Sequence, residues 1–228
     1  MGCRESEKIK KRELVNYDSS GTYSNRNIWY GVTILLLFYI EIIKPWRRKP
    51  KIKIEFRQEE PYCKEVPLAN LQNIPSYWMC IKVENIGKQI AKGVEGRLVE
   101  IKDKDGNSIS KFVPLILRWA SRPYSKIPDI KDVRMDINRG ASWFLDVIYI
   151  ADVTKLKSSE KEKYEIWGQK AHICDIYMGL STGTLKDIDP GEYYLKIIIY
   201  GDNIEPFSKT FRLIWRGKYK DIIFEEAR

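Results

Sequence analysis

One apolar run near the N-terminus constrains this chain more than any other feature. Residues 28–43 read IWYGVTILLLFYIEII, and Glu41 is the only charged side chain among them. At about 1.5 Å per residue, a helix of this length spans about 24 Å, somewhat less than the ~30 Å hydrocarbon core of a bilayer. A run that is apolar on every face and is followed by a basic cluster at 44–53 is typical of a membrane helix, whereas a buried core helix is the simpler alternative. We expect a single transmembrane helix at 28–43.

A cleaved secretory signal fits this run less well. The chain continues as EIIKPWRRKPK, which lacks the small residues of a cleavage site. Pro45 has no amide hydrogen and is expected to end the helix. The run is therefore interpreted as an anchor that stays in the mature chain.

The residues that flank the run match the two ends of a membrane helix. Tryptophan and tyrosine favour the membrane–water interface, and the long lysine and arginine side chains can extend to lipid head groups. We therefore expect membrane lipid as one partner of the chain. The predicted membrane-interface residues are Trp29, Tyr30, Tyr39, Lys44, Trp46, Arg47 and Arg48.

The distribution of lysine and arginine predicts an orientation. Residues 18–27 carry only Arg26, whereas six basic residues lie within 44–53. By the positive-inside rule, the chain is a single-pass membrane protein whose C-terminal domain faces the cytoplasm. The basic residues at 8–12 favour a cytoplasmic N-terminus instead, so the opposite orientation stays open. The cluster at 44–53 also suits anionic lipid head groups.

The first residues suggest a second route to the membrane. Residues 1–6 read MGCRES, which fits the pattern for N-myristoylation at Gly2, with Cys3 as a possible second acylation site. Myristoylation needs a cytoplasmic N-terminus, which conflicts with the orientation just predicted. Acylation at Gly2 and Cys3 therefore stays open.

The net charge does not indicate a nucleic-acid partner. The chain carries +9 at pH 7, but residues 1–50 alone hold ten Lys/Arg and five Asp/Glu. Residues 54–228 hold 28 basic and 26 acidic side chains, so this part of the chain is nearly neutral. A basic binding face has no support, and we expect no nucleic-acid partner.

Cysteine and histidine are too few and too scattered for a metal site. Cys3, Cys63, Cys80 and Cys174 form no Cys-x-x-Cys pair, and His172 is the only histidine. A structural zinc ion usually needs four clustered ligands, so we expect neither metal nor cofactor. A disulfide between Cys63 and Cys80 suits an oxidising compartment, and free buried thiols suit a cytoplasmic domain.

Beyond the basic cluster, short alternating runs separated by turns predict a β-rich domain. Tyr, Trp, Ile and Val suit a pleated sheet, and no long stretch keeps the helical period. The turn DKDGN at 103–107 is expected to join two strands into a hairpin. Residues 121–133 are expected to form a long loop, and residues 155–163 either a solvated loop or a short surface helix. The predicted strands cover residues 51–57, 76–85, 94–101, 108–113, 134–137, 143–150, 193–200 and 207–215, with a last edge strand at 219–224.

Two of these segments resemble the immunoglobulin-like domains of uncharacterised prokaryotic membrane and surface proteins. Residues 77–101, YWMCIKVENIGKQIAKGVEGRLVEI, are similar to a strand, Asn-x-Gly, strand hairpin. Residues 190–203, PGEYYLKIIIYGDN, are similar to a late segment of bacterial adhesion-type sandwich domains. The resemblance covers less than a quarter of the chain and implies a fold, with no catalytic residue. The irregular middle at 114–175 departs from a seven-strand module.

Two motifs could carry chemistry, but a structural role explains each more simply. His172 and Cys174 share one face if AHICD is a strand, although no nucleophile motif accompanies them. Asp103, Asp105 and Asn107 resemble the start of a calcium loop, but a hairpin turn explains the same residues. We therefore expect no catalytic residue and no enzyme.

These observations predict a mainly β protein, an antiparallel immunoglobulin-like β-sandwich preceded by one N-terminal transmembrane helix. The expected function is that of a non-enzymatic module that displays the loops at 114–133 and 151–175 to a protein partner. The alternative is an extracytoplasmic envelope or surface protein of structural or adhesion type. The expected organisation is a polar tail at 1–27, the transmembrane helix at 28–43, a basic hinge at 44–53 and the sandwich domain at 54–228.

Overall fold

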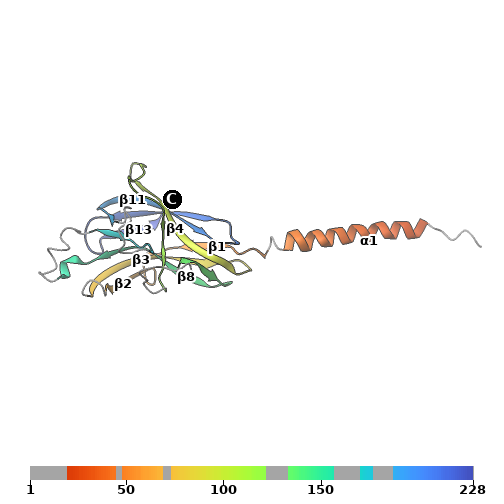
Figure 1. The fold of residues 1–228 in the computed structure, drawn as a ribbon, viewed down its shortest axis with the longest axis horizontal. Helices are drawn as coiled ribbons and strands as arrows, with labels where there is room; N and C mark the ends of the chain where they lie inside the picture. The colour runs from red at the N-terminus through yellow and green to blue at the C-terminus, as the bar shows by residue number, and fades with distance from the viewer. Residues whose placement is uncertain are drawn as a thin grey trace, which may run out of the picture. The chain divides into compact units, whose positions relative to one another are not determined.

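The computed structural model describes residues 20–44, 48–68, 73–121, 133–156, 170–176 and 187–227 (Figure 1). The chain divides into two compact units, Met1–Arg48 and Lys49–Arg228. The described part of the first unit is helical, and that of the second is built of strands.

The first unit contains one long helical stretch. Helix α1 covers Ser20–Phe38 and continues as a π-helical turn, Tyr39–Ile43. The amide of Lys44 donates to the carbonyl of Tyr39, so the backbone stays helical up to the residue before Pro45. The helix begins eight residues before the apolar run that predicted it. Hydrophobicity marks where a helix is apolar, whereas Ser, Asn and Arg also adopt helical backbone and give no such mark.

Among the described helices, none combines the length with the apolar character that crossing a membrane requires. The helix that contains residues 28–43 therefore falls short of the combined length and apolar character expected of the predicted transmembrane helix. The first two turns of α1 are polar, SGTYSNRN, and lower the mean hydropathy of the helix. The apolar run itself has 16 residues, against the ~20 that a bilayer core needs.

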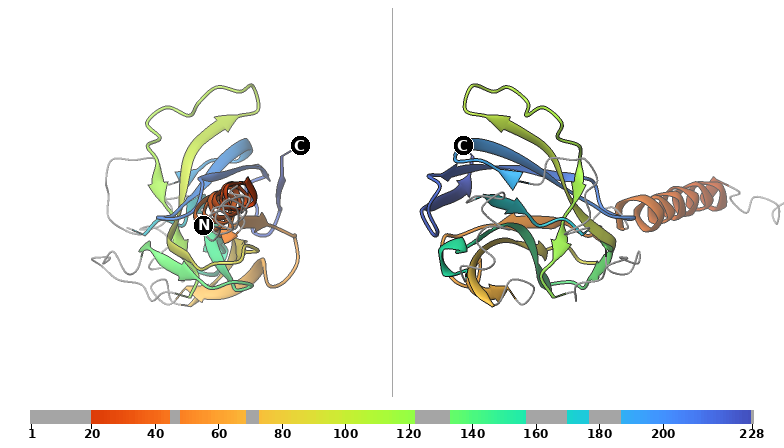
Figure 2. Two further views of the ribbon diagram at one scale, coloured as in Figure 1. Left: turned by 90° about the vertical axis from the view of Figure 1, so that its right-hand side faces the viewer. Right: turned by 60° about the vertical axis from the view of Figure 1, so that its left-hand side comes forward.

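The second unit consists of two antiparallel sheets that face one another (Figure 2). Within the described residues, the first sheet has seven strands in the order β1-β3-β8-β9-β10, with β2 also paired to β3 and β6 to β8. Its strands are β1 (Ile52–Glu55), β2 (Cys63–Leu68), β3 (Ile74–Asn85), β6 (Arg118–Trp119), β8 (Ser142–Ala151), β9 (Ala171–Ile173) and β10 (Asp187–Ile188). A short 3₁₀ turn, Val153–Lys155, follows β8.

The second sheet has six strands within the same described residues, in the order β13-β12-β11-β4-β5, with β7 also paired to β4. Its strands are β4 (Ala91–Asp103), β5 (Leu115–Ile116), β7 (Met135–Ile137), β11 (Gly191–Tyr200), β12 (Phe207–Trp215) and β13 (Ile222–Glu226). The prediction of a mainly antiparallel β domain is confirmed.

One core fills the space between the sheets. Met79, Ile81 and Val83 of β3 point into it from the first sheet, as the alternation of this strand predicted. Leu195 and Phe211 reach it from β11 and β12 of the second sheet. Because a strand presents alternate side chains to opposite faces, β3 and β11 each reach this core with every second residue, Met79, Ile81 and Val83 from β3 and Leu195, Ile197 and Ile199 from β11.

A second apolar cluster covers the outer face of the first sheet. We call it the outer cluster. It explains why the middle of β3, from Trp78 to Ile81, is buried on both faces. It contains Leu68, Ile74, Trp78, Cys80, Ala151, Leu156 and Cys174.

The predicted hairpin around residues 103–107 is only partly correct. The turn forms, with the amide of Gly106 donating to the carbonyl of Asp103 at 3.1 Å, but residues 108–113 make no strand. Ser108 forms a single bridge to Lys102, and Lys111 then takes a positive φ of 64°. A left-handed residue interrupts extended backbone, so pairing along β4 stops here and resumes only at β5.

The remaining strand predictions agree with the structure in their positions to within a few residues. The strands predicted at 134–137 and 143–150 form as β7 and β8, and β7 pairs with β4 and β8 with β3. The last edge strand forms as β13, a few residues beyond 219–224. The segment expected as a loop at 114–133 contains the short strands β5 and β6, and its residues 122–132 lie outside the described residues, as do 157–163.

Candidate functional site

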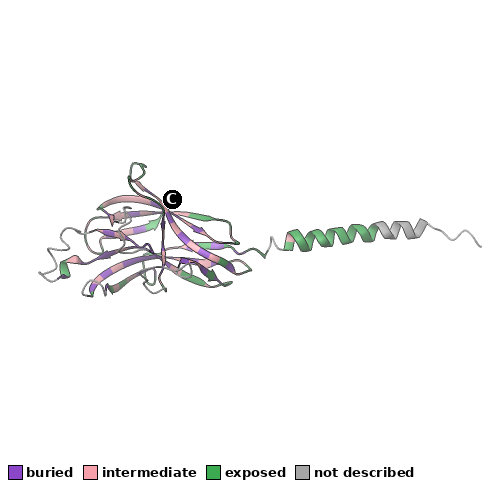
Figure 3. Cartoon of the chain, in the orientation of Figure 1, coloured by how far each residue is buried: buried purple, intermediate pink, exposed green. Residues whose placement is uncertain are grey.

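The apolar helix segment at 28–43 exposes its side chains on every face (Figure 3). Trp29 and Leu35 are 70% and 69% exposed, and five consecutive residues from Ile34 to Phe38 are all exposed. Five consecutive residues point in every direction around a helix, so no face is reserved for packing on protein. The exposed large apolar side chains of this segment are Ile28, Trp29, Tyr30, Val32, Ile34, Leu35, Leu36, Leu37, Phe38, Tyr39, Ile40 and Ile42.

One polar side chain inside this segment is satisfied by the helix backbone. The hydroxyl of Thr33 donates to the carbonyl of Trp29 at 2.8 Å, within the same helix. A hydroxyl satisfied in this way does not need water, and in an apolar solvent an unsatisfied one would be costly. Glu41 lies in the last, π-helical turn, three residues before Lys44 in the sequence.

The structure describes five of the seven residues predicted at the membrane interface. Trp29, Tyr30 and Tyr39 are exposed on the helix, Lys44 is exposed at its end, and Arg48 is exposed four residues later. The other two, Trp46 and Arg47, lie outside the described residues.

One buried side chain, Asn85, holds the chain where it enters the sheet domain. Asn85 lies at the end of β3, and its side-chain oxygen accepts hydrogen bonds from the amides of Lys51 at 3.3 Å and Gly87 at 3.0 Å. Its amide nitrogen donates to the carbonyls of Gln89 at 2.7 Å and Ile137 at 3.0 Å. One amide side chain therefore joins the start of β1, the β3–β4 turn and the end of β7.

Gly87 completes this corner. A Cβ atom at position 87 would lie 2.3 Å from the nitrogen of Lys51 and 2.7 Å from the carbonyl oxygen of Lys49. Only glycine lets the β3–β4 turn approach the incoming chain so closely. The Asn-x-Gly segment that carried the resemblance therefore has a structural role here.

His172, the only histidine, is packed and paired. Its Nδ1 lies 2.7 Å from Oδ1 of Asp187, and its ring stacks on Tyr149 with the centroids 4.9 Å apart. Tyr149 stacks in turn on Trp78 at 4.7 Å. Neither contact of His172 supplies a serine or thiol nucleophile. Cys174, its predicted neighbour, belongs to the outer cluster.

A buried charge, that of Asp146, lies beside the outer cluster. Asp146 is fully buried, accepts a hydrogen bond from the thiol of Cys80 at 2.9 Å and forms an ion pair with Arg118 at 2.6 Å. The guanidinium of Arg118 also lies over the ring of Trp78, 5.2 Å from its centroid. Burial raises the pKa of the Cys80 thiol far above its ordinary value, and the nearby carboxylate of Asp146 adds to the shift. Burial likewise raises the pKa of Cys174.

The sequence analysis missed this buried pair. Asp146 is the one acidic residue in the apolar strand at 143–150, and Arg118 is the one charged residue in the segment LILRWA at 115–120. A lone charge inside an apolar strand indicates a buried partner. The two residues are 28 positions apart, and the sequence between them gave no sign that they would pair.

The disulfide considered between Cys63 and Cys80 does not form. Both thiols are free, as is that of Cys174. Cys63 faces the core between the sheets, whereas Cys80 faces the outer cluster. Since the two side chains lie on opposite faces of one sheet, a disulfide would have to pass through the sheet.

The calcium-like segment is a hairpin turn. The carboxylate of Asp103 accepts hydrogen bonds from the amides of Asp105 and Asn107, both at 2.9 Å, and from the side chain of Asn107 at 3.2 Å. The backbone bonds lower the pKa of Asp103. Within the described residues, no group of His, Cys, Asp and Glu side chains could hold a metal ion.

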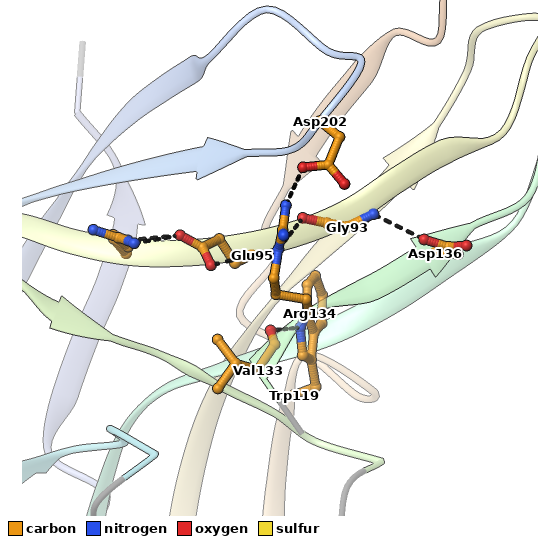
Figure 4. A network of polar contacts seen from close by, with 8 residues as sticks. Gly93, Glu95, Trp119, Val133, Arg134, Asp136 and Asp202 are labelled. Atoms are coloured by element: carbon orange, nitrogen blue, oxygen red, sulfur yellow. Dashed lines mark hydrogen bonds and ion pairs between the residues drawn. The ribbon is translucent and has the colours of Figure 1, made fainter. Parts of the chain in front are cut away.

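A polar network fixes a bulge at the start of β4 (Figure 4). Gly93 has a φ of +57°, its amide donates to Asp136 at 2.8 Å, and its carbonyl accepts from Arg134 at 3.1 Å. Arg134 also forms ion pairs with Asp202 and, at 3.9 Å, with Glu95. These contacts join β4, β7 and the β11–β12 loop, which gives the network a structural role.

Comparisons with known proteins add little to this picture. No family model and no curated protein matches the chain. Among solved structures, the X-ray structure of Northeast Structural Genomics Consortium target SoR45 matches at 15% identity, covering 75% of this chain and 89% of that chain, with a TM-score of 0.27. A likeness this weak carries no argument about fold or function.

Proposed function

We propose that this chain is a membrane-anchored, non-enzymatic β-sandwich protein that presents its sheet domain to a protein partner at a lipid surface. The observation that carries the proposal is the apolar helix segment at 28–43, which exposes large apolar side chains on every face. Exposed apolar patches of this kind mark a surface that is covered by lipid or by protein.

Lipid suits this segment better than a protein groove does. An amphipathic helix that docks in a groove keeps one polar face, and this segment has none. Moving each large apolar side chain out of water is worth about 1.5–3 kcal/mol when the side chain is fully exposed beforehand. The aromatic residues at both ends of the segment and the basic residues after it match the chemistry of the head-group region.

The cytoplasmic side is the proposed location of the sheet domain. The excess of lysine and arginine at 44–53 supports it through the positive-inside rule. The free thiols of Cys63, Cys80 and Cys174 also support a reducing compartment, where disulfides are rare.

The protein partner is proposed from the resemblance to immunoglobulin-like domains of adhesion type. Two facing antiparallel sheets with a shared core support an immunoglobulin-like arrangement. Such domains carry out their function through loops and sheet edges.

Flotation with neutral phosphatidylcholine vesicles tests the anchor. The full chain is expected to float with the vesicles, and the double variant Leu35→Lys, Leu36→Lys is expected to stay at the bottom of the gradient, since each buried lysine costs about 2.5–3.5 kcal/mol at the bilayer centre. Val113→Lys, which changes an exposed apolar residue of the sheet domain, is the matched control and should float. Equal flotation of the double variant would contradict the proposal.

Two further experiments test on which side of the membrane the sheet domain lies and whether it has a protein partner. Protease added to intact cells should leave the sheet domain whole, and its digestion would indicate the alternative role as an extracytoplasmic envelope or adhesion-type protein. The full chain in nanodiscs, used as bait in native extract, should retain a partner in stoichiometric amount. Recovery of nothing beyond what empty nanodiscs retain would count against an interaction module.

A further inference from the structure

Three connections of the sheet domain meet at the end where the chain enters it. The carbonyl of Asn85 in the β3–β4 turn accepts from the amide of Gly140 in the β7–β8 turn at 2.9 Å. The side chain of Asn85 also holds Lys51, as described above. Glu205 of the β11–β12 loop forms an ion pair with Lys49 at 3.5 Å. We call this end of the domain, formed around Lys49, Lys51, Asn85, Gly140 and Glu205, the hinge rim.

The β11–β12 loop is bound firmly into the rim. The side chain of Asn203 accepts from the amide of Lys92 at 2.8 Å and donates to the carbonyl of Ile90 at 2.9 Å. The amide of Asp202 donates to the carbonyl of Lys92 at 2.9 Å. These hydrogen bonds fix the β11–β12 loop against the start of β4.

Exposed apolar side chains of the sheet domain gather at this rim. Among the described residues of the second unit, four large apolar side chains are exposed, Ile86, Val113, Trp143 and Phe207, and all except Val113 belong to the rim. Ile86 lies in the β3–β4 turn, Trp143 at the start of β8 and Phe207 at the start of β12. Single exposed apolar residues are normal on a protein surface, so the distinguishing feature of this end is that three of the four lie there.

The two aromatic residues point toward the interior of the sandwich at its open end. Trp143 lies opposite Val83 in the register of β8 and β3, and Phe207 lies opposite Ile199 in that of β12 and β11. Val83 and Ile199 are core residues, and cross-strand pairs share a face of the sheet. Trp143 and Phe207 thus continue the core to the point where protein no longer covers it.

The rim also carries uncompensated positive charge. Lys51, Lys88 and Arg139 are exposed, and none of them forms an ion pair with another described side chain. The acidic residues of the β11–β12 loop already form ion pairs, Asp202 with Arg134 and Glu205 with Lys49. Asp136, also exposed here, accepts from the amide of Gly93.

We infer that the hinge rim is a second lipid contact, at which Ile86, Trp143 and Phe207 enter the head-group region of an anionic bilayer while Lys51, Lys88 and Arg139 bind its anionic head groups. This inference rests on the proposed anchor, because only residues 44–48 separate the rim from the apolar helix segment. Aromatic and apolar tips beside basic side chains are the combination that favours a membrane interface. A protein partner at the rim is the competing occupant and is decided by the test.

Hydrogen exchange of the full chain in nanodiscs tests the inference. The chain is placed in neutral phosphatidylcholine discs and in discs containing anionic phosphatidylserine. Residues 86–90, 138–143 and 203–207 are expected to exchange several-fold more slowly in the anionic discs, whereas β11 should exchange equally in both. About 1 kcal/mol for each basic residue near an anionic surface corresponds to roughly fivefold per charge. Equal exchange at the rim in the two kinds of disc would overturn the inference.

Variants separate the rim from the anchor. Lys88→Glu with Arg139→Glu, and Trp143→Ser, are expected to remove the protection at the rim while the chain still enters the discs. Lys104→Glu and Val113→Ser, which change exposed residues outside the rim, should keep it. Protection that survives the charge reversals would also overturn the inference. If the chain enters neither kind of disc, the proposed anchor itself is wrong and the rim contact falls with it.

Discussion

Amide side chains hold this domain together where main-chain pairing stops. Asn85 binds four backbone groups, Asn203 binds two at the start of β4, and Gln58 binds two on β13. A carboxamide has both a donor and an acceptor, so it can replace a neighbouring strand over one residue pair. At the scale of single residues, such substitutes leave few backbone groups unsatisfied at the corners of the sheets.

The buried pair of Asp146 and Arg118 gives a sharp stability prediction. Arg118→Met should destabilise the domain by about 3–5 kcal/mol, because it leaves a buried carboxylate without its partner. Arg216→Met, which breaks the exposed pair with Asp221, is the control and should cost less than about 1 kcal/mol. Urea unfolding in mild detergent, followed by tryptophan fluorescence, measures both. Equal costs for the two variants would show that Asp146 is not buried as described.

The buried thiols give a prediction about pH. Burial raises the pKa of Cys63, Cys80 and Cys174, so the reactive thiolate stays scarce in the folded state as the pH rises through the range where a free thiol ionises. In a Cys3→Ser chain, we expect almost no reaction with a disulfide reagent between about pH 7 and pH 9, and three equivalents after unfolding in guanidinium. Rapid reaction of the folded chain at pH 8 would contradict the assigned burial.

At the scale of elements, the central strand β3 organises the first sheet. It pairs with β1, β2 and β8, and its middle is buried on both faces because the outer cluster covers it. The hydrogen-bond register of these pairs brings Asn85 beside Ile52, where the chain enters the domain. The corner at Asn85 and Gly87 and the edge at β13 are the two places where this arrangement can be tested.

Gly87→Ala tests the corner. Its new methyl group would meet backbone atoms of Lys49 and Lys51, which cannot move aside as a flexible side chain can, so we expect a loss of about 3 kcal/mol. Gly106→Ala is the matched control, since its surroundings are open and only its positive φ opposes alanine, at about 1 kcal/mol. Thermal unfolding of the two variants gives the comparison. A smaller loss at Gly87 than at Gly106 would mean that the corner is looser than described.

Gln58→Ala tests the edge strand β13. The side chain of Gln58 donates to the carbonyl of Ile222 at 2.7 Å and accepts from the amide of Phe224 at 3.2 Å, and thereby covers part of an exposed edge. Its removal should cost about 1–2 kcal/mol and free the edge for pairing with a second chain. Gln89→Ala, at an exposed residue, is the control. Light scattering should show more self-association for the first variant, and equal scattering would exclude a protective role.

Alternation of apolar and polar residues was enough to predict most strands. It located β1, β3, β8, β11 and β12, because each of them has a face in the core. It could not predict that β7 and β8 take different partners, since pairing depends on contacts distant in sequence. It also failed at the outer cluster, because Trp78 and Cys80 follow the alternation of a solvated face. Of the candidate site, the exposed aromatic residues were predicted, whereas the buried pair and the hinge rim depend on the fold.

At the scale of the whole molecule, the chain joins an apolar helix segment with exposed side chains to a sheet domain that has a core of its own. Among the described residues, both apolar clusters of the sheet domain consist of residues of the second unit. The exposed side chains of the apolar helix segment belong to neither cluster, which supports the proposal that lipid surrounds them. Lipid around residues 28–43 is the central claim of this account.

Accessibility of a spin label at Leu35 tests that claim most directly. The label is attached to a Leu35→Cys, Cys3→Ser chain in phosphatidylcholine vesicles, where the buried native thiols should not react. Power saturation should show strong relaxation by oxygen, which dissolves in hydrocarbon, and weak relaxation by a water-soluble nickel chelate. The reverse, with the chelate reaching the label freely while the chain remains bound to the vesicles, would contradict an anchor at 28–43.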